Sequence, residues 1–306
     1  MELHHLQTFV IVAEEQSITR AARRLYTTPS AVSMHIKALE DELNVRLFVR
    51  SSRGMQITEI GERLREKARS TLHAAQEMVN YASASQEYLL GNITLGLNAS
   101  PRYLRIAQLI KALNADCPGI DLLMKNSSTG GVIAGVKQGQ MDVGFCFGEI
   151  NDPLLISQPL GVAELVIAAP IAWAAQIADA DWESIACLPW INTGADCPFQ
   201  PLIDALFTPR GISYRQQVQT DDEMTRGALV AAGVGISLLE RQEAQELVDA
   251  GSAILWAAPP TYCDLSIIYP VHRQHDPLIK AVVQQGAASV GAGVLGLTKV
   301  DHWRAP

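Results

Sequence analysis

The sequence predicts a multidomain protein that combines α+β and α/β architecture, and three stretches carry that prediction. Residues 17–53 show a helix-turn-helix pattern, residues 59–90 favour one long helix, and from Gly91 onward apolar strands alternate with helices. A chain of 306 residues exceeds the usual single domain. We therefore divide it into an N-terminal unit of residues 1–58, a linker helix over 59–90, and an α/β unit over 91–306.

The recognition motif covers residues 18–37. Ser17 is suited to accept hydrogen bonds from the free amides of a helix that begins at Ile18. A short break ends at Pro29, and proline is favoured in the first turn of a helix because its missing N–H would have no partner there. An earlier helix, with Leu6 and Phe9 on its apolar stripe, would pack beneath this pair. The arrangement predicts a helix-turn-helix.

The second helix of such a motif lies in the major groove of DNA, with its N-terminal residues over the base edges. Four apolar residues at helical spacing are expected in the core, namely Ala31, Val32, Ile36 and Leu39. The side chains left to face DNA are Thr28, Pro29, Ser30, Ser33 and Met34, with Lys37 placed to reach a phosphate.

This segment resembles the DNA-binding domain of a LysR-type transcriptional regulator. The resemblance rests on five motifs: S-x-T-x-A-A-x-x-L from Ser17, P-S-A-V-S from Pro29, I-x-x-L-E from Ile36, L-N-V-R-L-F-x-R from Leu43, and I-T-E-x-G from Ile57. Thr28 stands where the family most often has Gln, and Met34 where it often has Arg or another polar residue. The resemblance therefore implies DNA binding as a class rather than a particular operator.

Residues 46–58 predict two short strands around a turn, which is typical of the wing of a winged helix-turn-helix. Arg50 and Arg53 would contact the DNA backbone or a minor groove. The alternative is a solvated basic hairpin without a role. The net charge of −8 argues against a protein whose whole surface is basic enough to bind nucleic acid non-specifically. The recognition segment, by contrast, is locally basic.

The linker helix carries apolar residues on one face, at Ile60, Leu64, Ala68, Leu72, Ala75, Val79 and Ala82. A lone helix of this length cannot bury that face. We expect it to mediate dimerisation, so that two recognition helices read two half-sites. The alternative is that the apolar face of this helix packs on the α/β unit of the same chain.

Alternating strands and helices in residues 91–306 predict a parallel sheet covered on both faces. The expected strands are 92–97, 120–125, 141–147, 162–169, 188–192, 216–219, 235–239 and 264–269. The expected helices are 102–115, 131–138, 182–186, 200–207, 222–232 and 277–285. Residues after Gly286 are rich in Ala, Gly and Val and predict a loosely ordered tail.

The family resemblance implies that this half is a regulatory domain with two lobes, similar to a periplasmic solute-binding protein. Lobe I would comprise residues 91–160 and 265–290, and lobe II residues 161–264. The chain would cross between them near residues 159–162 and 262–265. A small-molecule effector is then expected between the lobes, and no cofactor is expected.

Ligands of open α/β sheets gather where strand carboxyl ends meet helix N-termini. Here such points supply hydroxyls and amides suited to a carboxylate or other anion, although ordinary N-capping explains the same residues. The family resemblance implies an acidic or aromatic metabolite, so the expected effector is a carboxylate or aromatic acid. Arg102 is equally a surface residue, and Phe147 and Phe199 are more readily core than ligand contacts. The candidate effector-binding residues, several from the resemblance, are Ser100, Pro101, Arg102, Ser128, Thr129, Phe147, Thr193, Cys197, Phe199, Thr220 and Asp221.

The five cysteines are scattered and odd in number, which predicts reduced thiols. Cys197 lies roughly where peroxide-sensing members of the family keep a reactive cysteine, so redox sensing is an alternative function. No second thiol is found between Gln200 and Arg215, where its partner would be expected.

An enzyme on the α/β half is the rival hypothesis from another class. The sequence contains no nucleophile elbow, no phosphate-binding glycine loop and no metal-ligand cluster, because its histidines are dispersed. A secreted solute-binding protein is disfavoured since the N-terminus does not resemble a signal peptide. We expect a cytoplasmic regulator without membrane contact, whose partners are operator DNA, further copies of itself as dimer or tetramer, and RNA polymerase if it activates.

Overall fold

The computed structural model describes residues 1–51, 54–84, 89–194 and 196–294. The chain divides into two compact units, residues 1–85 and residues 86–306. Arg53, one of the predicted wing contacts, lies outside the described residues, as do residues 295–306 of the predicted tail.

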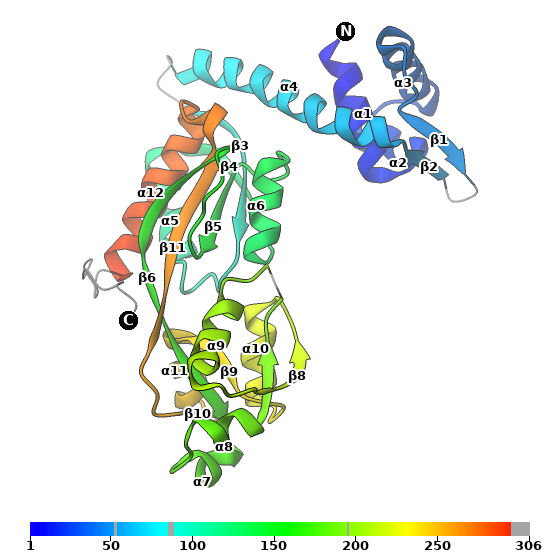
Figure 1. Cartoon of the computed structure of the whole chain (residues 1–306). Helices are drawn as coiled ribbons and strands as arrows, with labels where there is room; N and C mark the ends of the chain where they lie inside the picture. The colour runs from blue at the N-terminus through cyan, green and yellow to red at the C-terminus, as the bar shows by residue number, and fades with distance from the viewer. Residues whose placement is uncertain (52–53, 85–88, 195, 295–306) are drawn as a thin grey trace. The chain divides into compact units, whose positions relative to one another are not determined.

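The N-terminal unit is a winged helix-turn-helix (Figure 1). Its elements are α1 (Leu3–Glu15), α2 (Ile18–Arg24), α3 (Pro29–Leu43), β1 (Phe48–Ser51), β2 (Gly54–Ile57) and α4 (Glu59–Ala84). β1 and β2 pair antiparallel, with Phe48 opposite Ile57. Phe9, Val32 and Leu39 are buried at the centre of the core. The predicted stripe is therefore the packing face of α3, although Ala31 is only half-buried.

The linker helix is shorter than predicted. α4 ends at Ala84, and Leu90 already belongs to strand β3, so the expected boundary at residue 90 is wrong. The N-terminal half of its apolar face is also occupied, because Leu64, Ala68 and Leu72 pack against the core of the winged helix-turn-helix.

An ion-pair network holds α4 to the first two helices. The guanidinium of Arg69 lies 2.7 Å from Glu14, and the same carboxylate lies 2.7 Å from Arg24. Arg69 is buried, so the carboxylate of Glu14 compensates a charge that has left water. By contrast, Ile60 and Met78 are 42% and 71% exposed, so the N-terminal unit leaves part of the α4 surface uncovered.

The C-terminal unit is built on a mixed seven-stranded sheet. Its strands are β3 (Leu90–Leu97), β4 (Gly119–Asn126), β5 (Val143–Phe147), β6 (Leu155–Pro170), β9 (Ser237–Glu240), β10 (Ala253–Leu255) and β11 (Thr261–Pro270). The order is β10-β6-β11-β5-β3-β4, with β9 also paired to β6. Within this sheet only the β3–β4 and β3–β5 pairs are parallel, whereas β11 pairs antiparallel with β5 and β6, so the expectation of a purely parallel sheet is wrong.

Two long antiparallel strands connect the lobes. β6 and β11 pair along most of their length, and the predicted crossing points face each other, with Val162 opposite Asp264 and Gly161 opposite Leu265. The register shifts between Leu265 and Ser266, which interrupts the ladder at the crossing.

Helices surround both ends of these strands (Figure 1). They are α5 (Ile106–Asp116), α6 (Thr129–Lys137), α7 (Ala174–Ile177), α8 (Trp182–Cys187), α9 (Phe199–Phe207), α10 (Glu223–Ala231), α11 (Arg241–Asp249) and α12 (Pro277–Val294). The second lobe also contains the parallel pair β7 (Pro189–Asn192) and β8 (Arg215–Gln219). The helix α11 and the strand β10 were not predicted.

Further predicted boundaries in this unit are wrong. β6 begins at Leu155 rather than at residue 162. α5 begins at Ile106 rather than Arg102, because turns occupy the preceding residues and Arg105 has a left-handed φ of 49°. The final helix α12 continues to Val294, whereas a loose tail was predicted from Gly286. Val290 is completely buried in the core with Val282, and this burial outweighs the low helix propensity of the nearby glycines.

Candidate functional site

The N-terminus of α3 is held by hydroxyl caps. The side chain of Thr28 accepts the backbone N–H of Ala31 at 3.2 Å and lies 2.9 Å from the hydroxyl of Ser30. In the preceding helix Ser17 accepts the N–H of Arg20 at 3.3 Å, as its position predicted. These caps define the turn between α2 and α3.

The predicted DNA-facing residues share one exposed surface at the start of α3. Thr28, Pro29, Ser30 and Lys37 are exposed, and Met34 is 63% exposed. Ser33 is half-buried and donates its hydroxyl to the carbonyl of Pro29 at 2.9 Å, so its hydrogen is already used within the helix.

Tyr26 is a further candidate that the sequence analysis did not select. Its side chain is 98% exposed, and its backbone is left-handed with φ of 53° at the turn before α3. A non-glycine residue with positive φ and a bare aromatic ring is uncommon. The signal available in the sequence was an aromatic residue within the four-residue turn that precedes α3.

The net positive charge around the helix-turn-helix motif is smaller than the number of its arginines and lysines suggests. Arg24 pairs with Glu14, Arg20 lies 3.4 Å from Glu15, and Arg46 lies 3.2 Å from Glu40. The backbone of Arg50 pairs with Met55 across the wing hairpin. A count of charged residues within the motif does not include the glutamates that partly neutralise Arg20 and Arg24, because Glu14 and Glu15 precede the motif.

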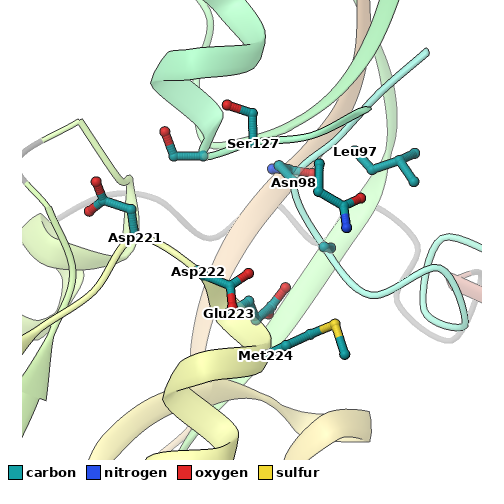
Figure 2. Close-up of a pocket in the computed structure, with 10 residues that line it drawn as sticks. Leu97, Asn98, Ser127, Asp221, Asp222, Glu223 and Met224 are labelled. Atoms are coloured by element: carbon teal, nitrogen blue, oxygen red, sulfur yellow. The ribbon is translucent and has the colours of Figure 1, made fainter. Parts of the chain in front are cut away.

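A pocket of about 220 Å³ lies between the lobes of the C-terminal unit. Its lining comes from the carboxyl ends of β3 and β4, the start of α6 and the start of α10: Leu97, Asn98, Ala99, Asn126, Ser127, Ser128, Asp221, Asp222, Glu223 and Met224. In Figure 2, Asn98 and Ser127 lie across the pocket from Asp222 and Glu223. The pocket thus occurs where parallel strands end, as expected for such a sheet.

Two of the predicted effector residues, Ser128 and Asp221, line this pocket. Ser128 caps α6 by accepting the N–H of Gly131 at 3.2 Å. Asp221 is exposed, and one of its oxygens lies so close to Gly194 that a Cβ there would be 2.0 Å away. The absence of a side chain at residue 194 therefore makes room for this carboxylate.

Other predicted hydroxyls are satisfied by local structure. Thr129 is buried, and its Oγ1 lies 2.9 Å from the side-chain amide of Asn98. Ser100 accepts the N–H of Tyr103 at 3.1 Å, and Thr220 accepts the N–H of Asp222 at 3.3 Å. The backbone N–H of buried Thr193 donates to Gln200 at 3.1 Å. Local hydrogen bonds thus already engage polar groups of these four residues.

The aromatic and charged candidates lie elsewhere. Phe147 and Phe199 are buried core residues with ring centroids 5.0 Å apart. Pro101 is exposed, and the exposed side chain of Arg102 lies 3.0 Å from Glu246 on α11. Arg102 therefore contacts the other lobe through a surface ion pair rather than facing the pocket.

Acidic side chains dominate the pocket. Asp221, Asp222 and Glu223 all line it, and the lining contains no lysine or arginine. Asp222 caps α10 by accepting the N–H of Thr225 at 2.8 Å. Glu223 is only 6% exposed, and its oxygens receive no N–H of the described residues; its hydrogen-bond partner is the carboxyl group of Glu243. The run Asp-Asp-Glu was visible in the sequence, but only its first residue was selected.

Behind Glu223 lies a buried group of ionisable side chains. Burial raises the pKa of Glu223, with Arg226 opposing and Glu240 reinforcing the shift. Burial and the neighbouring Glu223 likewise raise the pKa of Glu243. The guanidinium of Arg226 lies 5.0 Å from the centroid of the Phe199 ring. The two carboxyls titrate as a pair that resists double ionisation.

The five cysteines are free thiols in the structure. Cys197 is half-buried and packs against the main core, and its backbone N–H donates to Gly194 at 3.0 Å. The nearby thiol is Cys263, whose pKa burial raises to about 12, with a contribution from Cys197. A thiol with so high a pKa is a poor nucleophile.

Histidine positions are a second feature that the sequence analysis missed. His4 and His5 at the start of α1 lie beside His35 of α3, although the rest of α1 and all of α2 stand between them in the sequence. Only the packing of α1 on α3 brings these imidazoles together.

Comparison with known proteins identifies the family. Residues 3–62 match the model described as a bacterial regulatory helix-turn-helix protein of the lysR family, and residues 86–289 match the LysR substrate binding domain. The chain is 26% identical to the HTH-type transcriptional regulator YofA of Bacillus subtilis over 271 residues, which cover 88% of this chain and 92% of YofA.

Solved structures show the same fold. Full-length CbnR in complex with its target DNA has a TM-score of 0.66 at 20% identity, covering 94% of this chain and 100% of CbnR. LysG from Corynebacterium glutamicum, solved with bound effector Arg, has a TM-score of 0.60 at 20% identity, covering 95% of this chain and 98% of LysG.

A winged helix-turn-helix joined to a two-lobed regulatory domain is the architecture of an effector-responsive DNA-binding regulator. The chain belongs to the LysR family of transcriptional regulators. It is a DNA-binding regulator with an effector-binding domain and not an enzyme, consistent with relatives that are named as regulators. Among the described residues, no helix is long and apolar enough to cross a membrane.

Proposed function

We propose that this protein is a sequence-specific regulator whose DNA binding responds to a small molecule held in the pocket between its lobes. The observation that supports this proposal is the lining itself, because residues 97–99 and 126–128 come from one lobe and residues 221–224 from the other. A ligand that contacts both sets would favour the arrangement in which the lobes are close. Ligand-dependent regulation requires that the ligand bind one arrangement of the lobes more tightly than the other.

The chemistry of the pocket favours an effector with both a carboxylate and an ammonium group. The N-terminus of α6, with Ser127 and Ser128, offers hydroxyls and a positive helix end to a carboxylate. The opposite wall carries Asp221, Asp222 and Glu223 without a basic residue in the lining. A simple carboxylic or aromatic acid would bring a further negative charge to these carboxylates.

An ammonium group would instead compensate them. Glu223 is the strongest argument, because this buried pocket-lining carboxyl receives no N–H of the described residues and meets only Arg226 and the carboxyl of Glu243, so a bound ammonium group would add a further favourable contact. A zwitterionic, amino-acid-like molecule therefore fits both walls. LysG, which has the same fold, was solved with the amino acid Arg as its effector.

The transmission step is proposed to pass through β6 and β11. These paired strands connect the lobes and contain a register shift at the crossing, so closure would bend them there. The surface pair between Arg102 and Glu246 joins the same two lobes away from the pocket. Since both partners are exposed, this pair contributes little free energy and does not oppose movement strongly.

The DNA-binding half of the proposal rests on the exposed N-terminus of α3. Thr28, Ser30 and Met34 are available to base edges, and Lys37 to phosphate. We propose that two chains associate through the uncovered part of α4, where Met78 is exposed, so that two recognition helices read paired half-sites. Such a regulator acts in the cytoplasm, where chromosomal DNA lies, and contacts RNA polymerase if it activates.

Isothermal titration of the full-length protein tests the effector. Free amino acids are compared with the matched amines that lack the carboxylate and the matched acids that lack the amino group. We expect binding by an amino acid, at least tenfold weaker binding by both analogues, and loss of binding in Glu223→Gln. Glu183→Gln on α8, an exposed carboxylate outside the pocket lining, is the control and should bind normally.

The outcomes separate the parts of the proposal. Equal binding of the acid without an amino group, together with normal binding by Glu223→Gln, would show that the ammonium assignment is wrong. DNA binding is tested independently by footprinting on the region upstream of the gene. Protection that does not change with any bound amino acid would contradict allosteric control while leaving DNA recognition intact.

A further inference from the structure

Three histidines meet on the surface of the N-terminal unit. His4 and His5 lie in the first turn of α1, and His35 lies on the recognition helix α3. Their ligand nitrogens all fall within 4.8 Å of one another. The ring centroids are 4.3 Å apart for His4 and His5, 4.8 Å for His4 and His35, and 5.1 Å for His5 and His35. The three imidazoles thus surround one point.

Hydrogen bonds to Thr8 orient one of the rings. The hydroxyl of buried Thr8 donates to the carbonyl of His4 at 2.8 Å, so its only hydrogen is used. Nδ1 of His35 lies 3.0 Å from the same hydroxyl and must therefore be the donor in that contact. In the neutral ring the lone pair then belongs to Nε2. A ring nitrogen fixed by an outer hydrogen bond, with the other nitrogen left as a ligand, is typical of metal-binding histidines.

The other two rings also have ligand capacity. Nδ1 of His5 is a buried atom that has no hydrogen-bond partner among the described residues. His4 is exposed, and His5 and His35 are half-buried, so the cluster opens to solvent on one side. A cation and its remaining water ligands can therefore enter without disturbing the core.

We propose that His4, His5 and His35 bind one divalent transition-metal cation of the class that prefers imidazole, such as Zn²⁺, Co²⁺ or Ni²⁺. Three nitrogen donors leave at least one coordination position for water. Two nitrogens bound to one tetrahedral zinc at about 2.1 Å lie roughly 3.4 Å apart. The nitrogens would therefore close together by up to about 1.4 Å, which side-chain rotation at the solvent edge can provide.

A cation at this site would connect α1 to the recognition helix. His35 lies between Met34 and Lys37 on α3, and its side chain is half-buried whereas theirs are exposed. The metal would therefore sit behind the surface proposed to face DNA. The site is separate from the effector pocket, which belongs to the other compact unit. Metal binding and effector binding can accordingly be measured independently.

The test uses Co²⁺ as the probe, because its visible spectrum distinguishes a protein-bound tetrahedral ion from the hydrated ion. Metal-free full-length protein is titrated with Co²⁺, and Zn²⁺ is then added as competitor. We expect one Co²⁺ per chain, an intense visible band, displacement by Zn²⁺, and weaker binding at low pH because the imidazoles must be unprotonated. A spectrum that stays that of hydrated Co²⁺ would overturn the proposal.

Variants localise the site. His35→Gln and His4→Gln should each weaken Co²⁺ binding at least tenfold, and His4 is exposed enough that its substitution should not impair folding. Thr8→Val keeps all three ligands but removes the contact to Nδ1, and should weaken binding about tenfold. His275→Gln, in the other unit, is the control. Unchanged affinity and spectrum in His4→Gln and His35→Gln would overturn the assignment.

Discussion

The carboxylate of Glu40, on the recognition helix α3, accepts the backbone N–H of Leu47 at 2.7 Å. The same oxygen accepts the N–H of Phe48, the first residue of the wing, at 3.2 Å. Glu40 is only 8% exposed, so these bonds form where water competes little. One side chain thus ties the recognition helix to the wing.

Removing this carboxylate should destabilise the N-terminal unit. Glu40→Ala leaves two buried N–H groups without their acceptor, and we expect a loss of about 2–3 kcal/mol in the free energy of unfolding. Urea denaturation of the full-length protein followed by circular dichroism measures it. Asp41→Ala, on the same helix but exposed, should change stability by less than about 0.5 kcal/mol. Equal effects of the two substitutions would contradict this role.

Lys37 should contribute to DNA affinity without reading sequence. Lys37→Ala is expected to weaken binding to specific and scrambled duplexes alike and to lower the slope of log affinity against log salt by about 1. Fluorescence anisotropy at several salt concentrations provides both quantities. Lys67→Ala, an exposed lysine on α4, serves as the control. An unchanged slope in Lys37→Ala would mean that the ammonium group does not neutralise a phosphate.

The buried carboxyls predict how stability depends on pH. Burial raises the pKa of Glu223 to about 7 and that of Glu243 to about 9, from an ordinary value of 4.5. The folded protein therefore binds more protons than the unfolded chain above pH 4.5, and this stabilisation is complete below pH 4.5 and lost as pH rises through 7 toward 9. Each unit of raised pKa corresponds to about 1.4 kcal/mol.

Glu243→Gln removes one member of this pair, so its stability should fall less steeply between pH 5 and 9 than that of the parent protein, by on the order of 1–3 kcal/mol across the range. Thermal unfolding at intervals of half a pH unit measures the profile. Glu183→Gln controls for the general loss of one negative charge at an exposed position. Parallel profiles for all three proteins would show that the buried pair does not govern this dependence.

The final turns of α12 should be necessary for stability. Val290 is completely buried, and Val290→Ala is expected to cost about 2 kcal/mol through lost burial and the cavity left behind. Gln284→Ala, exposed on the same helix, should have little effect. Urea denaturation compares the two. If Val290→Ala unfolds at the parent's midpoint, residues 287–294 are dispensable, as a loose tail would be.

The helix-turn-helix was predictable because its determinants are local. Caps such as Ser17 and Thr28 and the proline at the start of α3 act within a few residues, so their spacing in the sequence is already the spacing in the structure. The same reasoning located the strand ends that form one wall of the pocket. It does not tell which polar groups at a strand end already have a partner: the hydroxyl of Thr129 lies 2.9 Å from the side-chain amide of Asn98, and the backbone N–H of Thr193 donates to Gln200 at 3.1 Å.

By itself, the sequence determined the class of protein: periodic apolar residues, caps and turn residues specify a winged helix-turn-helix followed by an α/β regulatory domain. The tertiary structure decided what depends on distant segments. The pairing of β6 with β11, the acidic wall around Glu223, the continuation of α12 to Val294 and the meeting of His35 with His4 all require residues far apart in the chain to be buried together. Local spacing carries no information about such burial, because it is the packed core that brings these segments into contact.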